Sequence, residues 1–83
     1  MNVNVRLSAG FAQTTGTTRL IIDLADGSTI ADLLVQLRAN YPAIETKLQT
    51  AVPTVAGRHA SASQLLSAGQ EVALLLPVAG GKA

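Results

Sequence analysis

Two glycines near the end of the chain, Gly80 and Gly81, are the residues whose type and spacing most favour chemistry. A glycine carbonyl has no side chain to obstruct an attacking group, and a Gly-Gly pair gives a thin backbone that can enter a narrow active site. The pair stands in residues 77–83, a stretch of mostly small residues with little ability to pack. Taken alone, the pair is more typical of a linker or a frayed terminus than of a functional site.

Other residue types used in catalysis occur without partners. The sequence contains no cysteine, and the single histidine, His59, has no neighbour at metal-ligand spacing. The sequence also shows no phosphate-binding loop, no pair of catalytic acids and no Ser-His-Asp arrangement. We interpret His59 as a surface or loop residue and expect a non-enzymatic protein with no bound cofactor or metal.

Length and composition narrow the class further. The chain has 83 residues, enough for one domain but not for two, and 48% of them are hydrophobic. A net charge of +1 with one Tyr and one Phe disfavours nucleic acid as a partner. The longest apolar run, residues 72–79, is far shorter than the roughly 20 residues that span a bilayer. We therefore expect a cytoplasmic protein with no nucleic-acid and no membrane partner.

Alternation of apolar and polar residues predicts two strands in the first part of the chain. One covers residues 2–8 and the other residues 19–24, and the small polar residues 9–16 between them are predicted to form a loop. The inward side chains of these strands are Val3, Val5, Leu7, Leu20, Ile22 and Leu24.

A helix is predicted from about Thr29 to Asn40. The pattern Thr29-x-x-Asp32 is a short version of the capping box, and Pro42 discourages the helix from continuing. Residues 43–50 are predicted to add a further helical turn. Apolar residues recur at helical spacing at Ile30, Leu33, Leu34, Leu37 and Tyr41.

The second half of the chain is predicted to be mostly extended. Residues 52–55 contain Pro53, which indicates an edge strand, and residues 58–60 follow as a minor strand. Residues 62–68 are interpreted as a turn or short helix. Residues 71–76 are rich in Val and Leu, which is typical of a buried central strand.

This order of elements suits an α+β fold of the β-grasp type. Its first and last strands lie side by side and parallel in a mixed sheet, and one main helix packs on one face. We predict a β-grasp domain over residues 1–78 and a flexible C-terminal tail over residues 79–83. The predicted core includes Val5, Leu7, Leu20, Ile22, Leu33, Leu37, Leu74 and Leu76.

Residues 69–81 resemble the C-terminus of the ubiquitin-like sulfur carriers of the MoaD/ThiS type, which include the small subunit of molybdopterin synthase. The resemblance extends to residues 24–34 at the entry into the helix and to residues 40–44 at its exit. Residues 53–58 stand where many relatives have a Val-Asn-Gly turn. The family usually stops at its second glycine, whereas this chain continues through Lys82 and Ala83.

The resemblance implies that Gly81 carries sulfur and that Gly80 acts as a spacer. In this family an E1-like adenylating enzyme uses ATP to activate the terminal glycine carboxylate, and a sulfur donor then displaces AMP to leave a thiocarboxylate. Because an amide joins Gly81 to Lys82, that bond is the expected processing site, with a metalloprotease as the possible processing enzyme.

The implied receiver of the sulfur is the large subunit of molybdopterin synthase or another sulfur-accepting synthase. Thiamine, cysteine or siderophore biosynthesis could use the same carrier chemistry. A ubiquitin-like modifier joined to lysines, and a β-grasp binding module without covalent chemistry, are the remaining alternatives.

A partner docking patch is predicted beside the tail. If Leu74 and Leu76 point into the core, Leu75 must point outward, on the sheet face away from the helix. Pro77 and Val78 complete the predicted patch. The alternative is that Leu75 is a lone surface leucine, which is common.

Overall fold

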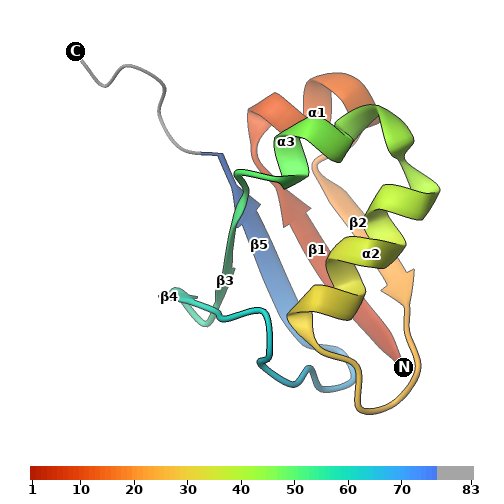
Figure 1. The fold of residues 1–83 in the computed structure, drawn as a ribbon, viewed down its shortest axis with the longest axis vertical. Coiled ribbons are helices and arrows are strands. Elements are labelled where there is room, and N and C mark those ends of the chain that lie inside the picture. Colours follow the sequence, from red (N-terminus) through yellow and green to blue (C-terminus); the bar gives the residue numbers. More distant parts are fainter. Residues whose placement is uncertain (77–83) are drawn as a thin grey trace.

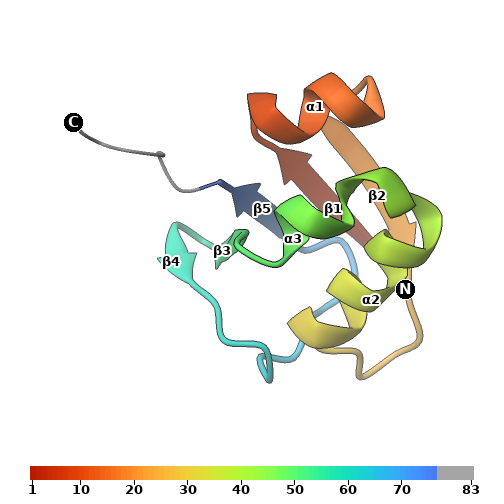
Figure 2. The same ribbon diagram turned by 45° about the horizontal axis from the view of Figure 1, so that its top comes forward.

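The structure is a computed structural model that describes residues 1–76 (Figure 1). Its framework is one five-stranded mixed sheet with helices on one face only, as the turned view in Figure 2 also shows. The strand order across the sheet is β2-β1-β5-β3-β4. The strands are β1 (Asn2–Leu7), β2 (Arg19–Asp23), β3 (Val52–Val55), β4 (Arg58–His59) and β5 (Glu71–Leu75).

The centre of the sheet joins the two ends of the described chain. β1 and β5 run parallel, with Val5 opposite Val72 and Leu7 opposite Leu74. β2 pairs antiparallel with the other side of β1, and β3 pairs antiparallel with the other side of β5. The predicted β-grasp fold, with parallel first and last strands, is therefore confirmed.

The main helix, α2 (Ile30–Asn40), begins and ends close to its predicted limits. Thr29 accepts a hydrogen bond from the Asp32 backbone N–H, and the Asp32 carboxylate accepts one from the Thr29 N–H, so the predicted capping box forms. A 3-10 turn, η1 (Pro42–Ile44), and the short helix α3 (Glu45–Leu48) follow. They correspond to the additional helical turn predicted from residues 43–50.

The loop predicted for residues 9–16 is wrong, because this segment forms the helix α1 (Ala9–Thr15). Its small and polar residues show no helical periodicity, and only Phe11 is buried. The side chain of Phe11 is 0% exposed and anchors the helix to the core, while Gly16 adopts a left-handed conformation that ends it.

The prediction that residues 52–55 form an edge strand is also wrong. β3 has β5 on one side and the two-residue β4 on the other, so β4 forms the edge. The Pro53 carbonyl accepts a hydrogen bond from the Ala60 N–H at 2.9 Å, so this residue joins the ladder through its carbonyl although proline has no N–H to donate. Residues 62–68 form turns, with one bridge between Thr29 and Leu65, and no helix.

The core lies between the sheet and the helices. Of the predicted core residues, all are buried except Leu20 and Leu76, which are partly buried and pack against the core. None of the helices formed by residues 1–76 is long and apolar enough to cross a membrane. The buried apolar residues are Val3, Val5, Leu7, Phe11, Ile22, Leu24, Ile30, Leu33, Leu37, Ile44, Leu48, Val55, Ala60, Leu66, Val72 and Leu74.

Candidate functional site

The candidate site begins where β5 ends, because the two glycines predicted to take part in chemistry follow that strand in the sequence. Leu75 is 45% exposed and lies on the sheet face that carries no helix, which we call the open face. Leu76 turns to the other side and packs against the core. The remaining predicted site residues lie outside the described part of the chain, and they are Pro77, Val78, Gly80, Gly81 and Lys82.

The open face combines apolar and basic side chains. Register places Arg6 of β1 between Arg19 of β2 and Ala73 of β5, with all three on this face. Ile21 of β2 is 69% exposed, the most exposed of the large apolar residues within residues 1–76. This mixture suits reversible docking of another protein, since isolated basic groups steer an encounter and apolar groups contribute contact area.

Arg6 is the central charged residue of the open face. Its guanidinium lies 3.9 Å from the carboxylate of Glu71, and both side chains are about half exposed. Three shallow hollows of about 410, 330 and 200 Å³ lie on this face, and Arg6 borders each of them. The predicted surface residue His59 is exposed and lies opposite Thr54 in the ladder between β3 and β4.

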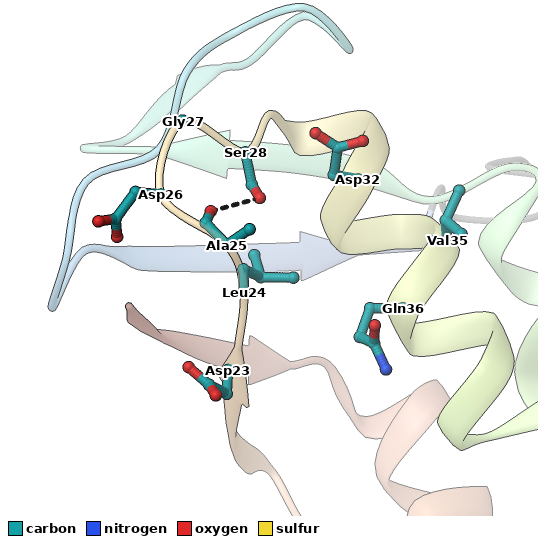
Figure 3. A pocket seen from close by; sticks show the side chains of 9 residues that line it. All are labelled: Asp23, Leu24, Ala25, Asp26, Gly27, Ser28, Asp32, Val35 and Gln36. Carbon is teal, nitrogen blue, oxygen red and sulfur yellow. Dashed lines mark hydrogen bonds between the residues drawn. The ribbon is translucent and has the colours of Figure 1, made fainter.

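A separate hollow of about 490 Å³ lies at the loop between β2 and α2 (Figure 3). Its polar groups have structural partners: the Ser28 hydroxyl donates to the Ala25 carbonyl, and the Asp32 carboxylate caps α2. Asp23 and Asp26 face the amino group of Met1 at 3.4 and 3.7 Å. Because β2 runs opposite to β5, this hollow lies at the other end of the sheet from Leu75.

Within residues 1–76, no three His, Cys, Asp or Glu side chains gather closely enough to hold a metal ion. At the end of β5, the exposed Leu75 gives the open face an apolar side chain that another protein could contact.

Sequence reasoning missed the support that α1 gives to the end of β5. The ammonium group of Lys47 on α3 donates hydrogen bonds to the Gly10 carbonyl at 2.6 Å and to the Thr14 hydroxyl at 3.2 Å. Gly10 in turn lies directly against the side chain of Leu76. No signal in residues 9–16 predicted this contact, because the segment was predicted to form a loop.

Comparison with known proteins agrees with this geometry. The chain is 29% identical over 83 residues to the molybdopterin synthase sulfur carrier subunit of Chlamydomonas reinhardtii, covering 98% of this chain and 100% of that protein. The crystal structure of SAMP1 from Haloferax volcanii superposes with a TM-score of 0.87 at 26% identity, covering 98% and 100% of the two chains.

A ubiquitin from Caldiarchaeum subterraneum shares the fold, with a TM-score of 0.66 at 17% identity and 98% of each chain covered. The sequence model described as the ThiS family matches residues 5–81, nearly the whole chain. The chain therefore belongs to the ThiS family of small, non-catalytic sulfur carrier proteins with the ubiquitin-like β-grasp fold.

Proposed function

We propose that this protein carries sulfur as a thiocarboxylate on Gly81. The observation that carries the proposal is the family match, which runs from residue 5 to residue 81 and so ends on the second glycine of the pair. The described domain supports it, because its last strand leads directly into the segment that contains Gly80 and Gly81.

The proposed chemistry needs only the glycine backbone from this chain. An oxygen of the Gly81 carboxylate attacks the α-phosphorus of ATP in an E1-like adenylating enzyme, and pyrophosphate leaves. A sulfide-level donor then attacks the acyl carbon, and AMP leaves with its bonding electrons to give the thiocarboxylate. Glycine suits this role because no side chain obstructs the carbonyl, while Gly80 acts as a thin spacer. Catalytic groups belong to the partner.

Lys82 and Ala83 must be removed before this reaction. Gly81 is joined to Lys82 by an amide, so the carboxylate that would be adenylated does not exist until the bond is cut. Activation at Ala83 instead would move the reacting carbonyl by about 7 Å in an extended chain. A site that positions its substrate tightly should reject that shift, since even about 1 Å can lower a rate on the order of a hundredfold. We propose that a processing metalloprotease makes the cut.

The adenylating enzyme is proposed to dock on the open face. Leu75 gives this face an exposed apolar residue directly before the tail, and Pro77 and Val78 are proposed to extend the contact. Ile21 and Arg6 widen the same surface toward β2. A partner seated there would lie on the side of the sheet that the helices leave free.

The proposed destination of the sulfur is molybdopterin, the precursor of the molybdenum cofactor. Support comes from the Chlamydomonas reinhardtii relative, which is named as the sulfur carrier subunit of molybdopterin synthase. The second proposed partner is accordingly the large subunit of that synthase. Delivery to thiamine, cysteine or siderophore synthesis would use the same activated Gly81 with another sulfur-accepting synthase.

A second candidate function is a protein modifier that is joined through Gly81 to lysine side chains. It is favoured by the likeness to the small archaeal modifier protein 1 of Haloferax volcanii, with a TM-score of 0.84 at 25% identity. The adenylate would be the same, but a lysine amine would replace sulfide as the attacking group. Immunoblotting of cell extracts for high-mass adducts of the chain would distinguish the two functions.

The central test compares the full chain with a version that ends at Gly81. Each is incubated with an E1-like adenylating enzyme, ATP and a sulfide source, and the intact protein is weighed by mass spectrometry. Only the shorter version should gain the mass of one oxygen-to-sulfur exchange. If the full chain keeps Lys82 and Ala83 and gains sulfur equally well, the processing step is wrong. If neither version gains sulfur, the carrier function is wrong.

A further inference from the structure

Lys47 is the only lysine in residues 1–81. The proposed cut after Gly81 removes Lys82, so no other lysine amine then remains in this part of the chain. The sequence contains no cysteine and therefore no thiol that could accept an acyl group. Hydroxyl groups are weak nucleophiles unless a neighbouring base activates them. Lys47 is therefore the side chain of residues 1–81 to which an activated acyl group would most readily be transferred.

The amine of Lys47 is bound to helix α1. Its Nζ atom donates hydrogen bonds to the Gly10 carbonyl oxygen at 2.6 Å and to the Thr14 hydroxyl oxygen at 3.2 Å. Residues 10 and 14 are one turn apart on α1, so both acceptors hold the amine on the same side of this helix. Lys47 is half-buried, although lysine side chains are mostly exposed. The side chain is therefore turned toward α1 instead of extending into solvent.

Helix α1 gives these hydrogen bonds a fixed support. Phe11 is fully buried and anchors the helix in the core. At the start of the helix, the Ser8 N–H donates to the Leu74 carbonyl at 3.2 Å, which ties α1 to β5. Before its amine can turn toward an acyl group, Lys47 must give up both acceptors on this anchored helix. That step is costly, because hydrogen bonds made by a charged group are stronger than those between neutral groups.

The amino group of Met1 is held in a similar way. It donates a hydrogen bond to the Leu24 carbonyl at 2.6 Å and lies 3.4 Å from the Asp23 carboxylate. Within residues 1–76, each amino group thus has a backbone carbonyl as a close hydrogen-bond partner.

We propose that the contact with α1 withholds Lys47 from acyl transfer, so that the activated Gly81 of one copy is not joined to Lys47 of another. The inference rests on the proposed activation of Gly81 and concerns which nucleophile takes the acyl group. In the withheld reaction, the Lys47 nitrogen would bond to the Gly81 acyl carbon. AMP would leave with the electrons of the C–O bond, and the amine would lose a proton to solvent.

This restraint has a consequence for each of the two candidate functions. In a sulfur carrier, the sulfide donor meets no competition from the carrier's own lysine. In a protein modifier, single copies are attached to the target, and no polymer linked through Lys47 forms.

The first test measures the reactivity of Lys47 without any partner. The chain ending at Gly81 is treated with N-hydroxysuccinimidyl acetate, an activated acyl ester, and peptide mass spectrometry follows the label at each amine. Arg38→Lys places a reference lysine on the exposed side of α2. We expect Lys47 to be acetylated about tenfold more slowly than this reference, because its hydrogen bonds must break first. The two rates should become equal in denaturant, whereas equal rates in the folded chain would overturn the inference.

A substitution on α1 shows whether the protection comes from the contact. Thr14→Val keeps the shape of the side chain and removes its hydroxyl, so acetylation of Lys47 should become about threefold faster. Thr46→Val, on the exposed side of α3, is the matched control and should leave the rate unchanged. If both variants change the Lys47 rate equally, the contact with α1 is not responsible and the inference is overturned.

The second test follows acyl transfer from Gly81 itself. The chain ending at Gly81 and its Arg38→Lys variant are incubated with an E1-like adenylating enzyme and ATP, without a sulfide source. Dimers linked through position 38 should form in the variant at least about tenfold more than dimers linked through Lys47 form in the wild type. Similar yields of the two dimers, or no dimer from an adenylated variant, would overturn the inference. If neither chain is adenylated, the carrier function fails, and the acetylation rates still decide whether Lys47 is withheld.

Discussion

Leu75 lies directly opposite Val52 in the antiparallel ladder between β3 and β5, and both side chains project from the open face. Val52 is half-buried and supports one side of Leu75, which remains 45% exposed. The two side chains form a small apolar patch at the end of the sheet where β5 ends. A partner that receives the tail would contact this patch first.

Replacing Leu75 by alanine should weaken docking of the adenylating enzyme. We expect KM for the chain ending at Gly81 to rise about tenfold, equivalent to about 1.4 kcal/mol, with the free energy of unfolding nearly unchanged. Steady-state kinetics and urea denaturation measure the two quantities. Leu65→Ala is the matched control, because Leu65 is 65% exposed and lies beside Thr29 at the start of α2. Equal KM values in the two variants would contradict the docking role.

Leu37→Ala should lower the free energy of unfolding by about 2 to 5 kcal/mol, because the side chain is 0% exposed and its removal leaves a cavity. Chemical denaturation measures the loss. Val35→Ala on the exposed side of the same helix should lose far less, since Val35 is 55% exposed. A loss below about 1 kcal/mol for Leu37→Ala would place this residue at the surface and contradict the helix register.

Lys47→Met should lower the free energy of unfolding by about 1 to 2 kcal/mol, because the Gly10 carbonyl loses a charged hydrogen-bond donor. Methionine keeps the length of the side chain, so the loss reports mainly on the hydrogen bonds. Arg38→Met on the exposed side of α2 is the control, since it removes one positive charge from another helix. Similar losses in both variants would show that net charge, and not the contact between α3 and α1, is responsible.

Deleting residues 80–83 should abolish sulfur loading and leave the melting temperature nearly unchanged. Every buried residue of the described core precedes Pro77, so the deletion removes none of them. Mass spectrometry and thermal denaturation of the same sample report the two properties separately. A large fall in melting temperature would mean that residues 80–83 pack against the domain and contribute to folding.

The parts of the fold that follow simple residue periodicity were predictable from the sequence. Val5 and Leu7 alternate with polar residues, and Leu33 and Leu37 recur at helical spacing, so their burial followed directly. Helix α1 was not predictable in this way. Phe11 is its only buried residue, and a single aromatic side chain gives no period from which to recognise a helix.

The candidate site was predictable only in part, for a similar reason. Alternation along β5 placed Leu75 outside and Leu74 inside, as the structure shows. The contact between Gly10 and Leu76 joins residues from opposite ends of the sequence and depends on the path of a helix that was predicted as a loop. Contacts of this kind depend on tertiary packing, which no local pattern contains.

The parallel pairing of β1 with β5 also determines when the domain can complete its folding. The hairpin of β1 with β2 and the helix α2 involve neighbours in sequence, so they can form early. The ladder between Val5 and Val72 must wait for nearly the whole chain to be synthesised and for a long loop to close. During synthesis the edge of β1 that pairs with β5 consequently lacks its hydrogen-bonded neighbour until residues 71–75 emerge.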